Sequence, residues 1–180
     1  MRHVISVLMQ NEVGALTRLT CLFSTRGYNI ESLNVAPTDD PLISRLTVVT
    51  TGSDAAIDQI TKQMSKQIDV VDMIDMTLGD HFERELALIK LRVPADTNDA
   101  VAAFCQTRDA RVLDDTCAAF TVEFAGSTAE VDALVAELQQ RADVLALVRS
   151  GSLGISRGAR VLAGEMTPAV AERQQATTDR

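Results

Sequence analysis

The turn from Asn11 to Gly14, with the sequence NEVG, could bind a small anion. It follows an apolar segment and precedes a segment whose apolar residues have helical spacing. The first N–H groups of a helix have no partner inside that helix, so they attract a carboxylate or a phosphate. A glycine at the turn lets such a ligand approach the backbone, because glycine carries no Cβ. The same turn could also do no more than redirect the chain.

A second glycine-rich stretch, RSGSLGISRG, runs from Arg149 to Gly158 and also follows a predicted strand. It matches neither GxGxxG nor GxxxxGK[ST], and no amphipathic helix follows it. We therefore expect a loop with positive φ angles at Gly151, Gly154 and Gly158. A small enzyme that uses this stretch remains an alternative, which turnover by the chain alone would support.

The other reactive side chains form no recognisable catalytic set. His3 opens the first apolar segment and His81 lies between the two halves of the chain, so we expect neither to have a neighbour that activates it. The pairs Asp39–Asp40 and Asp114–Asp115 lie at turns, where aspartate bonds to its own backbone. A weak divalent-ion site at either pair is the alternative. We expect no catalytic residue and no metal site.

Composition excludes several classes of protein. With 46% hydrophobic and 23% charged residues, the 180-residue chain is expected to fold, as one domain or two small ones. A net charge of −8 argues against a nucleic-acid partner. No segment approaches the roughly 20 apolar residues of a membrane span, and the N-terminus does not resemble a signal peptide. Cys21, Cys105 and Cys117 lack metal spacing, so we expect reduced, partly buried thiols and a cytoplasmic protein.

The first half of the chain has the pattern of a β-α-β-β-α-β unit. Strands are expected at 3–10, 28–36, 42–52 and 68–78, and helices at 14–26 and after a cap at Ser53 or Asp54. The apolar stripes of the two helices are Leu16, Leu19, Leu22 and Phe23, then Ile57, Ile60 and Met64. Gly27 is expected to end the first helix in a left-handed conformation.

The second half repeats the pattern. Strands are expected at 83–93, 110–115, 118–126 and 142–150, with a helix after Thr97 or Asn98 and another at the capping box of Ser127 and Glu130. The inward residues of these helices are Val101, Phe104 and Cys105, then Val131, Leu134, Val135 and Leu138. The sequence thus predicts an α+β protein of two ferredoxin-like βαββαβ sandwiches in series, at 1–80 and 81–160. Residues 161–180 are expected to form a flexible tail.

Three stretches resemble the regulatory (small) subunit of acetolactate synthase, also called acetohydroxyacid synthase. They are NEVGALTRLTCLFSTRGYNIESLNVAPTDD at 11–40, SRLTVVT at 44–50 and RSGSLGISRG at 149–158. The resemblance implies that the first sandwich is an ACT domain, the ferredoxin-like amino-acid sensor, and that the chain dimerises through it. It implies a separate catalytic large subunit that carries thiamine diphosphate, magnesium and FAD, whereas this chain carries no cofactor. Such subunits activate the enzyme and make it sensitive to branched-chain amino acids, above all valine.

The resemblance makes the turn at 11–14 a candidate valine site. The effector's carboxylate suits the backbone N–H groups at the helix start, and Asn11 offers both a donor and an acceptor. The residues expected from one chain are Asn11, Gly14, Ala15 and Leu16. By the resemblance, Asn29 and Ile30 would come from the partner chain and close the pocket across the dimer interface.

Two functions of different class remain. The first is a feedback-sensing regulatory subunit of acetolactate synthase, and the second is a stand-alone ACT-type amino-acid-binding module that serves another enzyme or regulator. Co-purification with a thiamine-diphosphate enzyme would favour the first. The second sandwich is expected to add to binding or activation without holding valine, because its first turn, VPADTNDA, lacks the Asn-x-x-Gly arrangement.

Overall fold

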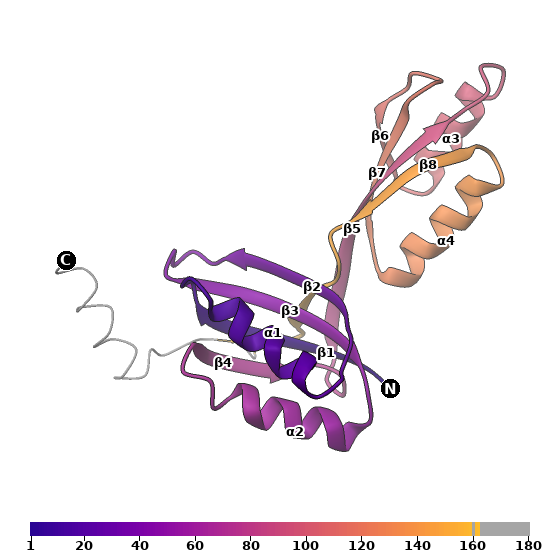
Figure 1. The fold of residues 1–180 in the computed structure, drawn as a ribbon. Coiled ribbons are helices and arrows are strands. Elements are labelled where there is room, and N and C mark those ends of the chain that lie inside the picture. Colours follow the sequence, from indigo (N-terminus) through magenta and orange to yellow (C-terminus); the bar gives the residue numbers. More distant parts are fainter. Residues whose placement is uncertain (160, 163–180) are drawn as a thin grey trace. The chain divides into compact units, whose positions relative to one another are not determined.

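The protein is described by a computed structural model for residues 1–159, 161 and 162 (Figure 1). The chain forms two compact units, Met1–Phe82 with the described residues from Gly154 onward, and Glu83–Leu153. The chain therefore leaves the first unit once and returns to it. The division at 80 and 160 expected from the sequence differs at this return, and the expected tail lies outside the described residues except for 161 and 162.

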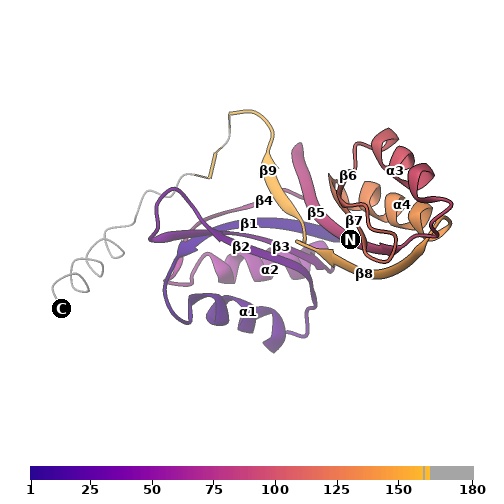
Figure 2. The ribbon, with the colours of Figure 1, turned by 90° about the horizontal axis from the view of Figure 1, so that it is seen from above.

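The first unit has the predicted β-α-β-β-α-β order. Its elements are β1 (Arg2–Gln10), α1 (Ala15–Thr25), β2 (Ile30–Pro37), β3 (Ile43–Thr51), α2 (Asp54–Met64) and β4 (Val70–Asp75). The strands form an antiparallel sheet in the order β2-β3-β1-β4. Figure 2 shows α1 and α2 on one face of this sheet. The two outer strands, β2 and β4, each have one side-neighbour in the described sheet.

Helix α1 packs on the sheet with a stripe that differs by one position from the predicted one. Ala15, Leu19 and Phe23 are buried, and these residues are spaced by about one helical turn. Leu16, expected to face inward, is 38% exposed, and Leu22 is only partly buried. Because α1 begins at Ala15, this small side chain takes the inward position of the first turn.

Helix α2 follows the prediction. The Ser53 side chain caps it by accepting a hydrogen bond from the Ala56 N–H. The predicted stripe of Ile57, Ile60 and Met64 is fully buried against the strands. Local sequence signals were sufficient here, because the cap and the apolar spacing lie within the same short segment.

The other face of the first sheet is covered by the returning segment. Val4, Val49, Ile74 and Met76 form a second apolar cluster on which Leu162 packs. The segment contains a short strand, β9 (Leu153–Ser156), which pairs with the strand β5 (His81–Arg92) and lies on the face opposite the two helices (Figure 2).

The prediction of a loop over 149–158 is therefore wrong in part, because residues 153–156 form a strand. Gly151 and Gly158 have positive φ, as predicted, but Gly154 does not and lies in β9. A Cβ on Gly154 would collide with the Met76 side chain. Close packing, rather than a left-handed backbone, requires this glycine.

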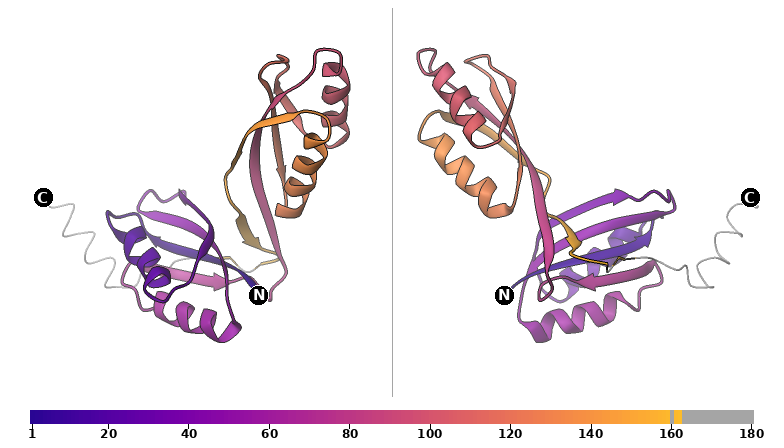
Figure 3. Two further views of the ribbon diagram at one scale, coloured as in Figure 1. Left: turned by 45° about the vertical axis from the view of Figure 1, so that its right-hand side comes forward. Right: turned by 180° about the vertical axis from the view of Figure 1, so that it is seen from behind.

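The second unit repeats the architecture. Its elements are β5 (His81–Arg92), α3 (Asn98–Thr107), β6 (Arg111–Asp114), β7 (Phe120–Gly126), α4 (Thr128–Gln139) and β8 (Asp143–Arg149). The sheet order is β6-β7-β5-β8, and Figure 3 shows α3 and α4 on the same face of it. Alternate residues of β5 are buried, as expected for a strand with one covered face. The core is Ala87, Ile89, Leu91, Val93, Val101, Cys105, Ala110, Phe120, Val122, Val131, Leu134 and Leu138.

Of the two helix starts in the second unit, that of α4 has the predicted cap, whereas that of α3 lacks a side-chain cap. The capping box of α4 is present, with the Ser127 N–H donating to Glu130 Oε2 at 2.7 Å and the Glu130 N–H donating to Ser127 Oγ at 3.3 Å. The hydrogen bond from the Ser127 N–H, followed by one that Ser127 Oγ donates to the same carboxylate oxygen at 2.7 Å, lowers the pKa of the Glu130 carboxyl. Helix α3 begins after Thr97 as expected, but the Thr97 side chain makes no capping bond.

Candidate functional site

The turn between β1 and α1 is held to the neighbouring β2–β3 loop. The Asn11 N–H donates to the Leu42 carbonyl at 2.8 Å, and Asn11 Nδ2 donates to the Pro41 carbonyl at 2.9 Å. One of the side-chain N–H groups that we expected to face a ligand is therefore used within the chain. The bond gives the turn a defined position at the end of β1.

Gly14 provides the conformation that the turn needs. It is the N-cap of α1 and has φ 85°, which favours glycine over other residues. Within α1 the first turn has no acidic residue and no side-chain cap. The Ala15 N–H is bonded to the Glu12 carbonyl at 3.2 Å, so the N–H groups that follow it, from Leu16 onward, are those that the helix start can offer.

Arg18, which we did not expect at the site from the sequence, lies at this turn. Its Nε and Nη2 donate to the Asp69 carboxylate at 2.6 and 2.8 Å, and the Asp69 side chain is only 4% exposed. A Cβ on Gly14 would lie 3.0 Å from Arg18 Nη1, so the guanidinium sits directly beside Gly14. The hydrogen bond to Asp69 raises the pKa of Arg18 above its usual value. A positively charged group therefore flanks the uncapped start of α1.

Apolar side chains surround the same turn. Val13 in the turn, Leu16 in the first turn of α1 and Leu42 in the adjoining loop are all exposed. Leu42 is fixed near the turn by the hydrogen bond from Asn11. The turn thus combines backbone N–H groups, a guanidinium and apolar carbon, which suit the carboxylate and the side chain of a small apolar amino acid.

The structure places Asn29 and Ile30 at the opposite end of the sheet. Ile30 pairs with Thr50 of β3, and the Asn29 carbonyl accepts a hydrogen bond from Thr50 Oγ1 at 2.6 Å. The residue before Asn11, Gln10, pairs with the other end of β3 at Ile43. Thr50 lies seven positions after Ile43 along the extended strand, about 23 Å at roughly 3.3 Å per residue. One chain therefore cannot bring both halves of the predicted site together.

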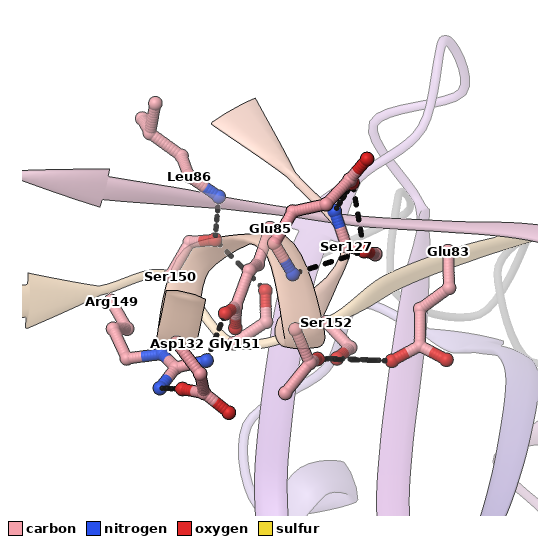
Figure 4. A network of polar contacts seen from close by, with 11 residues as sticks. Glu83, Glu85, Leu86, Ser127, Asp132, Arg149, Ser150, Gly151 and Ser152 are labelled. Carbon is pink, nitrogen blue, oxygen red and sulfur yellow. Dashed lines mark hydrogen bonds and ion pairs between the residues drawn. The ribbon is translucent and has the colours of Figure 1, made fainter. Parts of the chain in front are cut away.

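The second glycine-rich stretch uses its polar groups within the second unit (Figure 4). Arg149 forms ion pairs with the buried Glu85 and with Asp132, the latter at 2.7 Å. Ser150 Oγ accepts a hydrogen bond from the Leu86 N–H at 3.0 Å. The carboxylates raise the pKa of the Arg149 guanidinium, and the main cause is the hydrogen bond that Arg149 donates to Glu85. These bonds assign this end of the stretch a role in holding β5, α4 and β8 together.

Further along the stretch, Ser152 Oγ donates to Glu83 Oε1 at 2.7 Å (Figure 4). The Gly154 N–H donates to Thr47 Oγ1 at 3.3 Å. The Arg157 guanidinium pairs with Asp80 at 2.9 Å and lies 4.3 Å from the centre of the Phe82 ring. Three carboxylates therefore take up the charge of the two arginines, which leaves the stretch poorly suited to an anionic substrate.

His3 differs from expectation. Its buried ring has Asp54 at 3.5 Å from Nε2 and Asp75 at 4.0 Å from Nδ1, so two carboxylates do lie beside it. They come from α2 and β4, distant in sequence, and no nucleophile accompanies them in the described contacts of His3. The His81 ring bonds to the Gly79 carbonyl at 2.9 Å.

The acidic pairs act at turns, as predicted. Asp40 accepts from the Leu42 N–H and Asp114 from the Thr116 N–H, both at 2.9 Å. The hydrogen bonds from Thr116 lower the pKa of Asp114. Over residues 1–159, 161 and 162, no group of three or more His, Cys, Asp or Glu side chains is arranged to hold a metal ion. No helix in the same part of the chain is long and apolar enough to cross a membrane.

All three cysteines are free thiols, with Cys105 buried, Cys117 partly buried and Cys21 exposed. The expected partial burial is therefore wrong for Cys21, which lies on the outer face of α1 although its segment has helical spacing.

Both units match models of known protein families. Residues 5–72 match the AHAS small subunit-like ACT domain, and residues 84–158 match the small subunit of acetolactate synthase. The first unit, which carries the β1–α1 turn, is thus an ACT domain of the kind found in these small subunits.

Whole-chain relatives agree with both matches. The isozyme 3 small subunit of acetolactate synthase from Escherichia coli strain K12 is 41% identical over 162 residues, which cover 90% of this chain and 99% of that one. The small subunit from Haemophilus influenzae is 40% identical over 158 residues, covering 88% and 97%. The crystal structure of the small subunit from Thermotoga maritima has a TM-score of 0.79 at 29% identity, covering 89% and 99%. The chain belongs to the family of acetolactate synthase small subunits.

Proposed function

We propose that this chain binds the catalytic large subunit of acetolactate synthase, raises its activity and makes it sensitive to valine. The observation that carries the proposal is family membership over nearly the full length of small-subunit relatives. The catalytic subunit would supply thiamine diphosphate, magnesium and FAD, and this chain would act in the cytoplasm beside it. Its own contribution is regulatory, in the biosynthesis of valine, leucine and isoleucine.

The β1–α1 turn is the proposed effector site. A carboxylate placed at the start of α1 would accept from backbone N–H groups near Gly14 and Leu16 and gain from the positive end of the helix dipole. The ammonium group of the effector would lie near Asn11, which keeps its side-chain oxygen as an acceptor. Exposed carbon from Val13 and Leu42 suits the branched side chain of valine.

A second copy of the chain would complete the site. Asn29 and Ile30 cannot reach the turn of their own chain, because β3 separates the two ends of the sheet. Strand β2 lies at the edge of the described sheet, and edge strands can pair with an identical strand across a two-fold axis. We expect α1 and the segment 28–36 to form the dimer interface, so that Asn29 and Ile30 of the partner subunit close the pocket.

A site shared by two chains would connect valine to the enzyme's activity. A ligand shifts an equilibrium between two states only by its different affinity for them. Valine held between two ACT domains would favour the relative arrangement of chains that completes its pocket. If that arrangement is the less activating one, binding at the interface produces feedback inhibition without any contact with the catalytic centre.

The reconstituted enzyme tests the proposal. Catalytic subunit alone and catalytic subunit with this chain are assayed for acetolactate formation across a valine titration. We expect the chain alone to form no acetolactate, to stimulate the catalytic subunit severalfold and to make it sensitive to valine. Unchanged turnover together with unchanged valine sensitivity would reject the regulatory function.

A further inference from the structure

The position of Arg18 follows from helix geometry. Arg18 is four residues after Gly14, and side chains of a helix lean toward its N-terminus, so the arginine reaches back over the first turn. A Cβ on Gly14 would lie 3.0 Å from Nη1 and 3.8 Å from Cζ. The guanidinium therefore occupies the space beside Gly14, at the end of the helix where the effector's carboxylate is proposed to bind.

The guanidinium is held in one orientation. Asp69 accepts from Nε at 2.6 Å and from Nη2 at 2.8 Å, and its side chain is almost fully buried. The backbone carbonyl of Asp69 in turn accepts a hydrogen bond from the Gln10 N–H at 2.8 Å, which fixes residue Asp69 beside the end of β1. Because the guanidinium is planar, a fork that binds Asp69 through Nε and Nη2 leaves the Nη1 group facing Gly14.

The Nη1 group is suited to a carboxylate. None of the hydrogen bonds among the described residues uses it. Asp69 neutralises part of the charge of Arg18, and Glu12 lies close enough to interact with it electrostatically. We therefore expect Nη1 to act mainly as a directed donor rather than as a free positive charge. A charge-assisted hydrogen bond of this kind is shorter and stronger than one between neutral groups.

We infer that Arg18 binds the effector's carboxylate through Nη1, and that Asp69 is the positioning residue that aims it. The inference rests on the proposed effector site at the β1–α1 turn. It also gives Gly14 a second role, because a Cβ at this position would press on the Nη1 group at 3.0 Å as well as strain the backbone. The carboxylate would then be held by both the helix start and Arg18.

Arg18→Lys is the first variant to test. Lysine keeps a positive charge beside the buried Asp69, but a single ammonium cannot bind Asp69 with a fork and also present a directed donor to the turn. The matched control is Arg108→Lys, because Arg108 makes the same forked pair with Glu137 in the second unit, at 3.1 Å from Nε and 2.5 Å from Nη2. Both changes remove one guanidinium fork from the surface of a helix.

Two ligands, valine and valinamide, distinguish a role of Arg18 in binding the effector from a role in holding the structure. The full-length chain is titrated calorimetrically with valine and with valinamide, which lacks the carboxylate but keeps the side chain and the ammonium. We expect Arg18→Lys to weaken valine about tenfold, or about 1.4 kcal/mol, and to change valinamide binding less than twofold. Arg108→Lys should change neither affinity.

A second variant keeps the test valid if Arg18→Lys does not fold. The double substitution Arg18→Met with Asp69→Asn removes both charges and so avoids a buried, unpaired carboxylate. It should show the same loss for valine and the same tolerance of valinamide. Circular dichroism and stimulation of the catalytic subunit report whether each variant is folded.

Three results would overturn the inference. Unchanged valine affinity in the folded Arg18 variants would show that Arg18 does not bind the effector. An equal loss for valine and valinamide would assign Arg18 a structural role. Valine binding that is weakened as much by Arg108→Lys would show that the effect is not local. A wild-type chain that binds no valine would instead contradict the proposed function.

Discussion

The two units contain equivalent turns with opposite electrostatic character. In the first unit, β1 leads into α1 through a left-handed glycine, no acid lies in the first turn of α1, and Arg18 flanks the helix start. In the second unit, β5 leads into α3 through PADT, and Asp99 lies in the first helical turn. An acidic residue there stabilises α3 through the helix dipole but repels a carboxylate ligand. The start of α1, with Arg18 beside it, therefore favours a nearby anion, whereas the start of α3 already has a carboxylate in its first turn.

This difference suggests a division of labour between the units. Neither α1 nor α3 has a side-chain cap, which commonly contributes about 1 kcal/mol, and we propose that α1 keeps its first N–H groups for a ligand. The second unit uses its carboxylates and its capping box for its own stability. We expect the second unit to support binding or activation of the catalytic subunit without holding valine.

The largest effect is expected from Gly14→Asp. A second carboxylate about 4 Å from that of valine is repelled by about 4 kcal/mol at an effective dielectric of about 20. Even a quarter of this weakens valine about fivefold, and the new carboxylate would also pair with Arg18. The variant should fold and stimulate the catalytic subunit but ignore valine, as measured by inhibition of the reconstituted enzyme.

Thr97→Asp is the control at the equivalent turn of the second unit. Aspartate is a favourable N-cap, so this change should leave both stability and valine inhibition intact. Wild-type valine sensitivity in Gly14→Asp, or lost sensitivity in Thr97→Asp, would show that we have placed the site at the wrong turn.

We expect the edge strand of the first unit, but not that of the second, to lie in the dimer interface. Val35 on the edge strand β2 and Val148 on the edge strand β8 are both exposed. Val35→Lys should weaken the affinity of the dimer about tenfold or more. In a two-fold interface the new lysine of each chain would lie near the same lysine of the partner, and the two positive charges would repel each other. Val148→Lys should leave the dimer unchanged. Sedimentation at micromolar concentration measures both, and a wild-type monomer with and without valine would contradict dimerisation.

A moderate effect is expected from Asn29→Ala. The change removes hydrogen bonds without adding charge, so the binding of valine should weaken by about 1 kcal/mol, which is less than the loss expected for Gly14→Asp. Mixed dimers of Asn29→Ala and Gly14→Asp chains sharpen the test. If the site spans two chains, each mixed dimer has one intact site and recovers part of the wild-type valine binding. Mixed dimers without recovery would mean that each chain forms its own site.

The smallest effect concerns the capping box of α4. Ser127→Ala should lower the free energy of unfolding by about 1 kcal/mol and leave valine binding unchanged. The folded chain lowers the pKa of Glu130, so its contribution is present above the carboxyl's unfolded pKa and is lost as pH falls through the folded value. The wild-type advantage over Ser127→Ala should therefore shrink in acid. An advantage that is constant with pH would exclude a role for ionised Glu130.

Local signals predicted the order of the elements, a cap at Ser53 or Asp54, the stripe of α2 and the capping box of α4, because each depends on residues close in sequence. The strand β9 could not be predicted, because it forms only where the chain returns to pair with β5. The Arg18–Asp69 pair joins residues 51 positions apart, so no spacing rule reveals it. Gly14 was found from its residue type and its place between a strand and a helix.

The most direct test of the central claim is to follow the backbone amides of the full-length chain by nuclear magnetic resonance as valine is added. We expect saturable shifts at Gly14, Ala15 and Leu16, at the start of α1, and no shifts from Thr97 to Asp99 at the start of α3. Shifts confined to the second helix start, or a chain whose α1 amides do not respond while valine binds, would contradict the claim.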